Sequence, residues 1–506
     1  MIAIRAIPVV VVEADGVALP PEEIRSLAEV RVRQGLSLPA LCELTFGDPP
    51  LSATAVDRLG PGARLRLVLS ERREALFDGQ VTAVEYVYGP NRRREVHVRA
   101  YDLLHRLRKS QTVRAFQQVT VADLARELTA SVGLQVQAID EGPLWQTLIQ
   151  SRQTDLDFLL DVAERCGLYL SVHDGVLQLV TLEGAGEDLP LILGESLLEA
   201  RVEANGDPAC RSVTVEGWDV LLAAPHRGQA GSPRSGRSVD FEVAPGTLGA
   251  TGERVLIDVG APADPNAEAI AQAELDRCIA REVVLWGIAD GDPRIRPGAR
   301  VSITGVDERF AGRYVVNEVT HVVDGRTGFI SEFSTSPPLP RPRERGAVVS
   351  LGLVTRVDDP DRLGRVKVTL PTFGDVETDW MGVLTAAAGP NKGFVALPDV
   401  GDHVLVLFAH GDPVQGIVLG GLYGAQGPPD SGVDGGAVRR YTLQTPGGQH
   451  VQLDDHRQSI RLEDRSGSYV DLSPDLLRVH AAVDLEIEAP GRSVLIRGRS
   501  IDFESG

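Results

Sequence analysis

The first hundred residues alternate apolar and polar side chains along several short runs. The clearest runs are 64–70, 79–89 and 94–102, with turn-forming residues between them. Side chains two positions apart point to the same face of a strand, so this alternation is typical of an antiparallel sheet with one buried face. We therefore predict a first strand-rich domain over residues 1–102.

Between residues 103 and 189 the apolar positions follow a helical period instead. Each of two apolar stripes begins at a threonine cap with an aspartate three residues later and ends at a glycine. The first stripe has Thr120, Asp123 and Gly133, and the second has Thr154, Asp157 and Gly167. A strand pair follows, 168–172 and 176–181, joined by a His-Asp-Gly turn. This segment is predicted to be an α/β insertion.

Strand patterns return over residues 190–336, which we predict to be a second strand-rich domain. One helix is predicted near 265–282, and the segment 225–237 is predicted to be an exposed, flexible loop. The Pro-rich stretch 337–346 then marks a domain boundary. Residues 347–424 contain about five short strands, which suits a small Greek-key barrel of the oligonucleotide/oligosaccharide-binding (OB) type.

A Gly/Pro-rich linker, 425–440, precedes a repeat of short strands over residues 441–506. Pairs of apolar residues recur with a period near eight, separated by Gly, Asp, Ser and Arg: Val451/Leu453, Ile460/Leu462, Val470/Leu472, Leu477/Val479, Leu485/Ile487, Val494/Ile496 and Ile501/Phe503. Each repeat offers one strand with two apolar side chains on one face. No predicted helix or second sheet covers that stripe.

Three copies wound about one axis would cover it. Each strand is expected to pair with a neighbouring chain, the three stripes close a dry core, and closure removes exposed strand edges. The alternatives are a single-chain β-solenoid and an edge-exposed meander. The predicted fold class is therefore mainly β with an α+β insertion, ending in a trimeric β-helix needle.

The charge balance argues against a nucleic-acid partner. Lys and Arg total 51 and Asp and Glu total 71, a net charge of 51 − 71 = −20, and an acidic surface repels phosphate backbones and anionic membranes. The N-terminus lacks the layout of a signal peptide, and no stretch approaches the ~20 apolar residues of a membrane span. We expect assembly in the cytoplasm and release as part of a larger particle.

Cysteine and histidine spacing gives no sign of a metal or cofactor. Cys42, Cys166, Cys210 and Cys278 lie far apart without a CxxC pair, and we interpret them as four buried, reduced thiols. The closest histidine pairs are His403/His410 and His450/His456, and neither HExxH nor His-x-His occurs. We expect no cofactor, no metal and no catalytic residue.

An ordered string of residues within 347–424 is distinctive. It consists of Gly352, Asp359-Pro360, Gly364-Arg365-Val366, Pro371, Trp380, Ala388-Gly389, Leu397 to Asp402, Phe408, Gly411-Asp412-Pro413 and Gly420 to Tyr423. This string resembles the barrel domain of VgrG-type spike proteins. Upstream, Tyr101-Asp102, Gln153 to Phe158 and Gly312 to His321 resemble the hub protein of the phage late-control D family.

The resemblance implies that segments 1–102 and 190–336 are two hub β-barrels of a homotrimer. Such a trimer presents a pseudo-sixfold surface that matches a hexameric inner tube to a threefold needle. The implied function is the central, non-enzymatic spike of a contractile injection system, which punctures the target cell envelope. Inner-tube and baseplate proteins are the implied partners.

This chain departs from the commonest members of that family at its end. It is short and ends at Gly506 with no appended effector domain, which favours the spike of an extracellular phage-tail-like particle or of a contractile phage. Some spikes hold iron at the tip through His-x-His, and residues 497–506 have none. We therefore predict a separate PAAR-like tip protein, seated around Ile501 and Phe503.

Two other functions are weighed against this one. A cell-wall hydrolase needs two carboxylates across a cleft, yet the stretch from Gly424 to Tyr441 has no room for an inserted lysozyme, and no GxSxG elbow occurs in a strand-to-helix context. A receptor-binding or glycan-binding module would use the barrel, the tip or the 225–237 segment.

Overall fold

The protein was examined as a computed structural model, which describes residues 8–49, 58–69, 75–90, 93–219, 224–342, 346–425 and 427–503. The chain divides into two compact units, Met1–Gly421 and Leu422–Gly506, and each is described by itself. Among the described residues, no helix combines the length and the apolar character that crossing a membrane requires.

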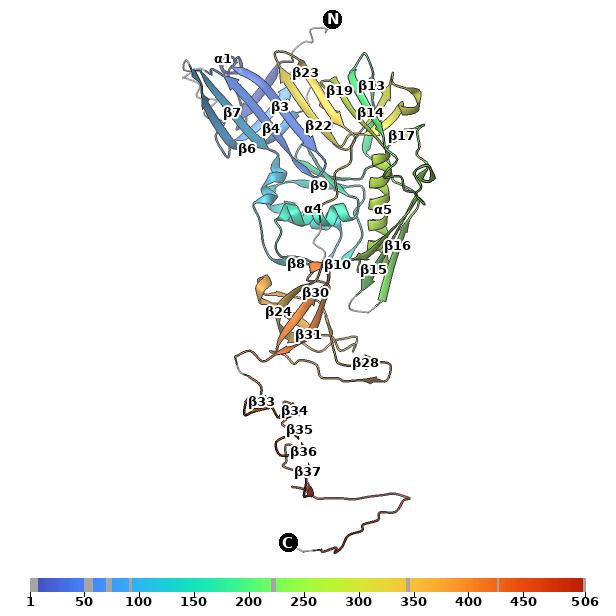
Figure 1. Ribbon diagram of the computed structural model, residues 1–506. Helices are drawn as coiled ribbons and strands as arrows, with labels where there is room; N and C mark the ends of the chain where they lie inside the picture. The colour runs from blue at the N-terminus through green and yellow to red at the C-terminus, as the bar shows by residue number, and fades with distance from the viewer. Residues whose placement is uncertain are drawn as a thin grey trace. The chain divides into compact units, whose positions relative to one another are not determined.

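One continuous sheet of eleven strands joins the N-terminal and middle segments of the first unit (Figure 1). Its order is β14-β19-β23-β22-β3-β4-β7-β6-β5-β1-β2. The strands are β1 (Val10–Ala14), β2 (Val17–Ala18), β3 (Leu27–Gly35), β4 (Leu38–Gly47), β5 (Arg64–Leu69), β6 (Ala75–Tyr88), β7 (Arg94–Tyr101), β14 (Leu197–Ala204), β19 (Val283–Asp290), β22 (Glu318–Asp324) and β23 (Gly328–Ser334). The short helix α1 (Pro21–Ile24) lies between β2 and β3.

The seam of this sheet is the antiparallel pair β3–β22, in which Val32 lies opposite His321. The alternation predicted from the sequence is present, because Val30 and Val32 are buried while Arg31 and Arg33 between them are exposed. The two strand-rich segments, which the α/β insertion separates in the sequence, therefore form one hydrogen-bonded sheet. We call residues 1–336 the hub.

The α/β insertion has the helices that the capping pattern predicts. In the capping box of α3 (Val121–Thr129), the Asp123 amide donates to Thr120 Oγ1 at 3.1 Å and the Thr120 amide donates to Asp123 Oδ2 at 3.2 Å. Thr154 accepts the Asp157 amide in the same way at the start of α4 (Asp155–Arg165). The other elements are η2 (Leu103–Arg108), β8 (Arg114–Val119), η3 (Ala130–Val132), β9 (Gln135–Ala138), β10 (Trp145–Gln150), β11 (Tyr169–His173) and β12 (Val176–Val180).

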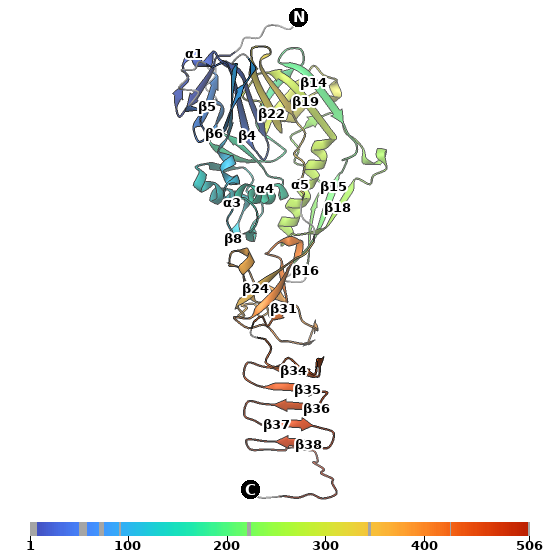
Figure 2. The same cartoon turned by 60° about the vertical axis from the view of Figure 1, so that its left-hand side comes forward.

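The long helix α5 (Asp264–Glu282) packs on a three-stranded sheet in the middle segment, as both views show (Figures 1 and 2). This sheet has the order β16-β15-β18, and a four-stranded sheet of the same segment has the order β13-β20-β21-β17. The strands are β13 (Ala185–Ile192), β15 (Ser212–Asp219), β16 (Ala224–Ala230), β17 (Ser238–Val239), β18 (Glu253–Val259), β20 (Ala299–Thr304) and β21 (Gly312–Val315), with η4 (Pro245–Leu248) and η5 (Glu308–Phe310) between them.

The prediction of an exposed, flexible loop over 225–237 is wrong. Its first half is strand β16, and its second half is fixed by Arg234, whose Nη1 lies 2.7 Å from Asp140 Oδ2 and whose amide donates to Asp276 at 2.6 Å. Gly228 lies so close to the backbone of α5 at Ala267 that a Cβ would clash. The Gly and Arg residues that indicated flexibility serve close packing and ion pairing instead.

The OB-type region is a six-stranded sheet of order β26-β25-β24-β30-β31-β27. Its strands are β24 (Val348–Arg356), β25 (Lys367–Leu370), β26 (Val376–Glu377), β27 (Gly382–Val383), β30 (His403–Phe408) and β31 (Gly416–Leu422), with η6 (Pro371–Phe373) and η7 (Ala409–Gly411). A separate hairpin is formed by β28 (Ala388–Gly389) and β29 (Lys392–Gly393). The core contains Val354, Val368, Val404, Val406 and Phe408.

A buried ion pair explains part of the distinctive residue string in this region. The Arg365 guanidinium lies 3.0 and 2.6 Å from the two carboxylate oxygens of Asp359, which also accepts the Leu363 amide at 2.9 Å. These contacts hold the pKa of Asp359 well below its usual range, chiefly through Arg365. They close a tight turn in which Gly364 has a φ of 72°.

The second unit, which we call the spike unit, contains an antiparallel meander of five strands, β34-β35-β36-β37-β38 (Figure 2). Its strands are β34 (Arg440–Gln444), β35 (His450–Asp454), β36 (Ser459–Glu463), β37 (Tyr469–Leu472) and β38 (Leu477–His480), preceded by the pair β32 (Val433–Asp434) and β33 (Ala437–Val438). The expected pairing of each strand with a neighbouring chain is therefore not what these five strands show. Turns of four or five residues let consecutive strands pair within the chain, which costs less loop entropy than a distant partner.

Burial of His321 predicts an acid-sensitive hub. Burial lowers the pKa of His321 to about 4, so between pH 6.5 and 4 the unfolded chain binds more protons than the folded one. The free energy of unfolding should then fall as the pH is lowered through that window, by up to about 1.4 kcal/mol per pH unit from this group. In the His321→Gln variant, the free energy of unfolding measured with denaturant at several pH values should fall less steeply between pH 6.5 and 4 than in the wild type. The same dependence of this free energy on pH in both proteins would contradict the prediction.

Loss of the buried ion pair should destabilise the OB-type region. Asp359→Asn removes the buried carboxylate beside Arg365 and leaves its guanidinium only the exposed Asp361, so we expect a loss of about 3 kcal/mol in denaturant unfolding. The neighbouring Asp358→Asn is the matched control, because Asp358 pairs with Arg356 at the exposed surface, where water screens the pair and little stability is at stake. Equal losses in the two variants would show that burial of the pair is not what matters.

Candidate functional site

The strongest candidate for a functional surface is one face of the meander. The register puts Tyr441 opposite Leu453, and it repeats this apolar pairing from strand to strand across the sheet. Two apolar columns result: Tyr441, Leu453, Ile460, Leu472 and Leu477 in one, and Leu443, Val451, Leu462, Val470 and Val479 in the other. We call these ten residues the spike face.

No described part of the single chain covers the spike face. Leu453, Ile460, Leu462 and Leu472 in the central strands are still 41–46 % exposed, and Leu477 at the edge is 65 % exposed. Ten neighbouring apolar side chains form a patch of the kind that marks a protein–protein contact rather than a surface for water. The register, rather than any single residue, creates it.

The opposite face of the same strands is polar and has its own interactions. The Arg461 guanidinium lies 4.1 Å from the centre of the Tyr469 ring and 2.7 Å from Glu463 Oε2, and Tyr469 stacks on His480 with ring centres 4.9 Å apart. Arg461 also lies opposite Asp471 in the register. Because these polar side chains pair with one another and can also be hydrated, this face of the sheet can remain exposed to solvent.

The residues predicted to contact a tip protein lie beyond the last strand of the meander. Ile501 is 50 % and Phe503 is 91 % exposed, and neither belongs to a strand. Leu485, Ile487, Val494 and Ile496 are likewise 53–68 % exposed without strand structure. The structure therefore brings the first four apolar pairs together. It leaves the last three pairs, of which Ile501/Phe503 is one, outside the meander.

Sequence reasoning missed Tyr441 and Leu443 as members of the spike face. Both belong to β34, the first strand of the meander, and lie opposite Leu453 and Val451. The signal was available, because Tyr441 and Leu443 have the same two-residue spacing as the later pairs. The aromatic ring and the preceding Gly-rich linker obscured it.

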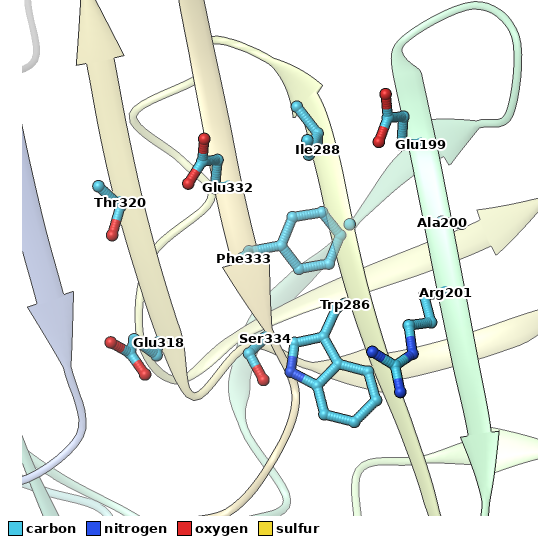
Figure 3. Close-up of a pocket in the computed structure, with 11 residues that line it drawn as sticks. Glu199, Ala200, Arg201, Trp286, Ile288, Glu318, Thr320, Glu332, Phe333 and Ser334 are labelled. Carbon is cyan, nitrogen blue, oxygen red and sulfur yellow. The ribbon is translucent and has the colours of Figure 1, made fainter.

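A surface depression lies over β14, β19, β22 and β23, and Figure 3 shows Arg201 beside the Trp286 ring, 5.2 Å from its centre. Glu318 at its rim is paired with Arg33 at 2.7 Å. Its lining contains acids, hydroxyls and aromatic rings but neither histidine nor cysteine, so it lacks a nucleophile with an adjacent base.

The buried titratable groups serve structure. Both carboxylate oxygens of Asp102 accept backbone amides, from Ala40 at 2.9 Å and Leu104 at 3.0 Å, and burial raises the pKa of Asp102 to about 7. All four cysteines are buried thiols, as predicted, and burial raises the pKa of Cys278 to about 12. A thiol with that pKa is a poor nucleophile.

The predicted histidine pairs do not form a metal centre. His450 Nε2 lies 3.5 Å from Glu463, whereas His456 Nδ1 lies 3.9 Å from Asp434. His403 begins β30, and the side chain of His410 lies outside the described residues. Over the part of the chain that the structure describes, no group of three or more His, Cys, Asp or Glu residues is placed to hold a metal ion.

Two family models match this chain. Residues 350–423 match the type VI secretion system/phage-baseplate injector OB domain, which is the region predicted to be an OB-type barrel. Residues 48–325, more than half of the chain, match the Alg8 N-terminal domain.

Two curated relatives and one solved structure show the same likeness. The chain is 25 % identical to the actin cross-linking toxin VgrG1 of Vibrio cholerae over 64 % of its own length and 33 % of the relative's. It is 24 % identical to the type VI secretion system spike protein VgrG1b of Pseudomonas aeruginosa over 92 % of its own length and 66 % of the relative's. It thus spans about a third of the first relative and about two thirds of the second.

The solved structure is that of the E. coli c3393 protein, described as a type VI secretion component similar to the T4 bacteriophage tail proteins gp27 and gp5. It superposes with a TM-score of 0.55 at 15 % identity over 81 % of this chain and 99 % of that one, which shows a shared, mostly β fold. The chain belongs to the Alg8 N-terminal domain family, whose model it matches over residues 48–325, and its injector OB domain and its curated relatives are those of VgrG-type spike and phage baseplate proteins.

Proposed function

We propose that three copies of this chain form the central spike and hub of a contractile injection system, and that the protein acts as a structural element rather than as an enzyme. The observation that carries the proposal is the spike face, a sheet face with ten apolar side chains that a single chain leaves in water. Membership of the VgrG-type family supports the same function.

Three spike faces turned toward one axis would close a dry core. Each meander then forms one side of a three-sided rod, with its apolar columns inward and the Arg461, Glu463 and Tyr469 face outward. The backbone ladder within each meander is already complete between neighbouring strands. Side-chain burial at about 25 cal/mol per Å² of apolar surface is therefore what the association adds.

The hub would connect this rod to a hexameric inner tube. Each chain contributes two strand-rich segments to one continuous sheet, so three chains present six similar segments around the axis. Inner-tube and baseplate proteins are the partners that such a ring would contact. Assembly would take place in the cytoplasm, and the particle would carry the spike out to the target envelope.

A separate PAAR-like protein would cover the end of the rod. The exposed side chains of Ile501 and Phe503, which no described residue of their own chain covers, support this part of the proposal. Capping by a second protein would shield them and would leave a sharper point than three free chain ends.

The mass of the purified protein in solution tests the trimer directly. Light scattering should give three times the chain mass of 54.3 kDa, and the value should be stable on dilution because separating the chains would expose all three spike faces to water. A mass equal to one chain, in a sample whose meander is folded, would overturn the proposed function.

A pair of neighbouring variants separates the two faces of the meander. Leu443 belongs to the spike face and is 52 % exposed in one chain, whereas Gln444, the next residue, points to the other face. Leu443→Asp should abolish the heat- and detergent-resistant trimer on gels, because three carboxylates enter one dry core at a cost of several kcal/mol each. Gln444→Asp should leave it intact; resistance in both variants would argue against an apolar core at this level.

A further inference from the structure

A second apolar face, with two exposed and five half-buried residues, lies on the outside of the OB-type sheet. In β24 and β30, Ser350, Val354, Val404 and Val406 point inward and are buried. The alternate residues point outward and are also apolar: Val349, Leu351 and Leu353 on β24, Leu405 and Leu407 on β30, and Ile417 and Leu419 on β31. We call these seven residues the barrel face.

The register joins the barrel face into one patch. Val349 lies opposite Leu407 and Leu351 opposite Leu405, so the side chains meet across β24 and β30, and β31 extends the patch as the next strand. Val349 is 52 % and Leu351 is 48 % exposed. An unbroken apolar run, such as residues 404–408 in β30, is typical of a sheet buried on both faces.

The same region carries an apolar arm that leaves the sheet. Residues 384–402 run out from β27 and return to β30 through the β28–β29 hairpin, which Figure 1 shows to one side of β24, β30 and β31. Between Leu384 and Pro398 the only charged residue is Lys392. Five apolar residues of the arm are exposed: Leu384 at 60 %, Phe394 at 48 %, Val395 at 85 %, Leu397 at 42 % and Val400 at 57 %.

The arm has a defined shape. Ala388 pairs with Gly393, the Phe394 amide donates to the Ala387 carbonyl at 3.0 Å, and the Leu384 amide donates to the Val418 carbonyl at 2.8 Å. At its turn Asn391 has a φ of 58°, a conformation that asparagine tolerates better than most residues. A hairpin that is formed in advance loses little entropy when it docks.

We propose that the arm of one copy docks on the barrel face of the next copy. This proposal rests on the proposed homotrimer, and it assigns a contact that closes the trimer at the level of the OB-type region. The donor and the acceptor are different surfaces of one chain, so the contact is head-to-tail. Such contacts close into a ring under threefold symmetry, with every arm docked and every face covered.

Two observations favour a second copy over another protein as the occupant. Both surfaces are apolar, with charge confined to Lys392, Asp399 and Asp402 of the arm, and both are present on every chain in equal number. In addition, β31 ends at Leu422, where the spike unit begins, so three chains held together along their spikes carry their barrel faces at high local concentration. A contact within such an assembly needs little affinity of its own.

Thiol labelling of single-cysteine variants of the full-length purified protein tests the proposal. The four native cysteines are buried, so the wild type gives the background. Val395→Cys should react with a maleimide at least about tenfold more slowly in the native protein than in denaturant, because the arm is covered by another copy. Ile139→Cys is the matched control: Ile139 is also 85 % exposed in the single chain but belongs to the α/β insertion, and it should react freely.

Cross-linking then identifies what covers the arm. The double variant Val395→Cys/Leu351→Cys, oxidised in the native state so that thiols in contact form a disulfide, should give covalent dimers and trimers on non-reducing denaturing gels, and neither single variant should. A double variant that stays at single-chain size would overturn the proposal, whether its arm folds back on its own barrel face or lies elsewhere.

The mass of the same sample keeps the two proposals distinguishable. A trimeric mass with a freely reacting thiol in the Val395→Cys variant overturns the arm contact and leaves the proposed function standing. A monomeric mass overturns both. A trimeric mass with protection and interchain products supports both.

Discussion

The structure depends on the antiparallel register that stacks apolar side chains into columns on one sheet face. In the meander of the spike unit this register places every aliphatic residue of five strands on the same face of the sheet. The backbone groups are paired between neighbouring strands, so the apolar side chains of that face are what still lack cover. A helix or a second sheet covers such a face in most domains. Here neither is present among the described residues of the spike unit, and in the proposed trimer copies of the same face would supply the cover.

Two separate regions of the chain share this property. The spike face and the barrel face are both sheets with apolar side chains in water, one in each of the two compact units. The hub is different, because its sheets have cores of their own: Val12, Val32 and Leu44 pack in one cluster, and Leu285, Val301 and Val319 in another. The hub therefore has cores that one chain can form, whereas the spike face and the barrel face would be covered only in the proposed trimer.

Hydrogen bonds, ion pairs and ring contacts join the parts of the first unit to one another. The β3–β22 seam joins its two strand-rich segments without a gap in the ladder, and Arg234 ties the insertion to α5 through Asp140 and Asp276. The OB-type region meets the insertion through Thr147 and Asp379 at 3.2 Å and through the Arg152 guanidinium over the Phe373 ring at 5.4 Å. A force applied to any of these parts is shared by several contacts.

The sequence by itself determined the local structure and the direction of burial. The caps at Thr120 and Thr154, the buried cysteines and the first four apolar pairs of the spike are as predicted, because each depends on residues close together in the chain. The string of residues in the OB-type region also indicated the family, although not that Asp359 and Arg365 act together in a buried turn.

Only the tertiary structure decided which surfaces meet. Periodicity gives the face that a strand buries, but the choice of partner strand depends on the whole chain; this is why β3 pairs with β22, why the spike strands pair within one chain, and why 225–237 packs on α5. The sequence analysis did not identify the arm as a separate exposed segment, because this too depends on the tertiary structure. Its apolar residues resemble core residues in sequence, and only their position away from the core shows that they are free to cover something else.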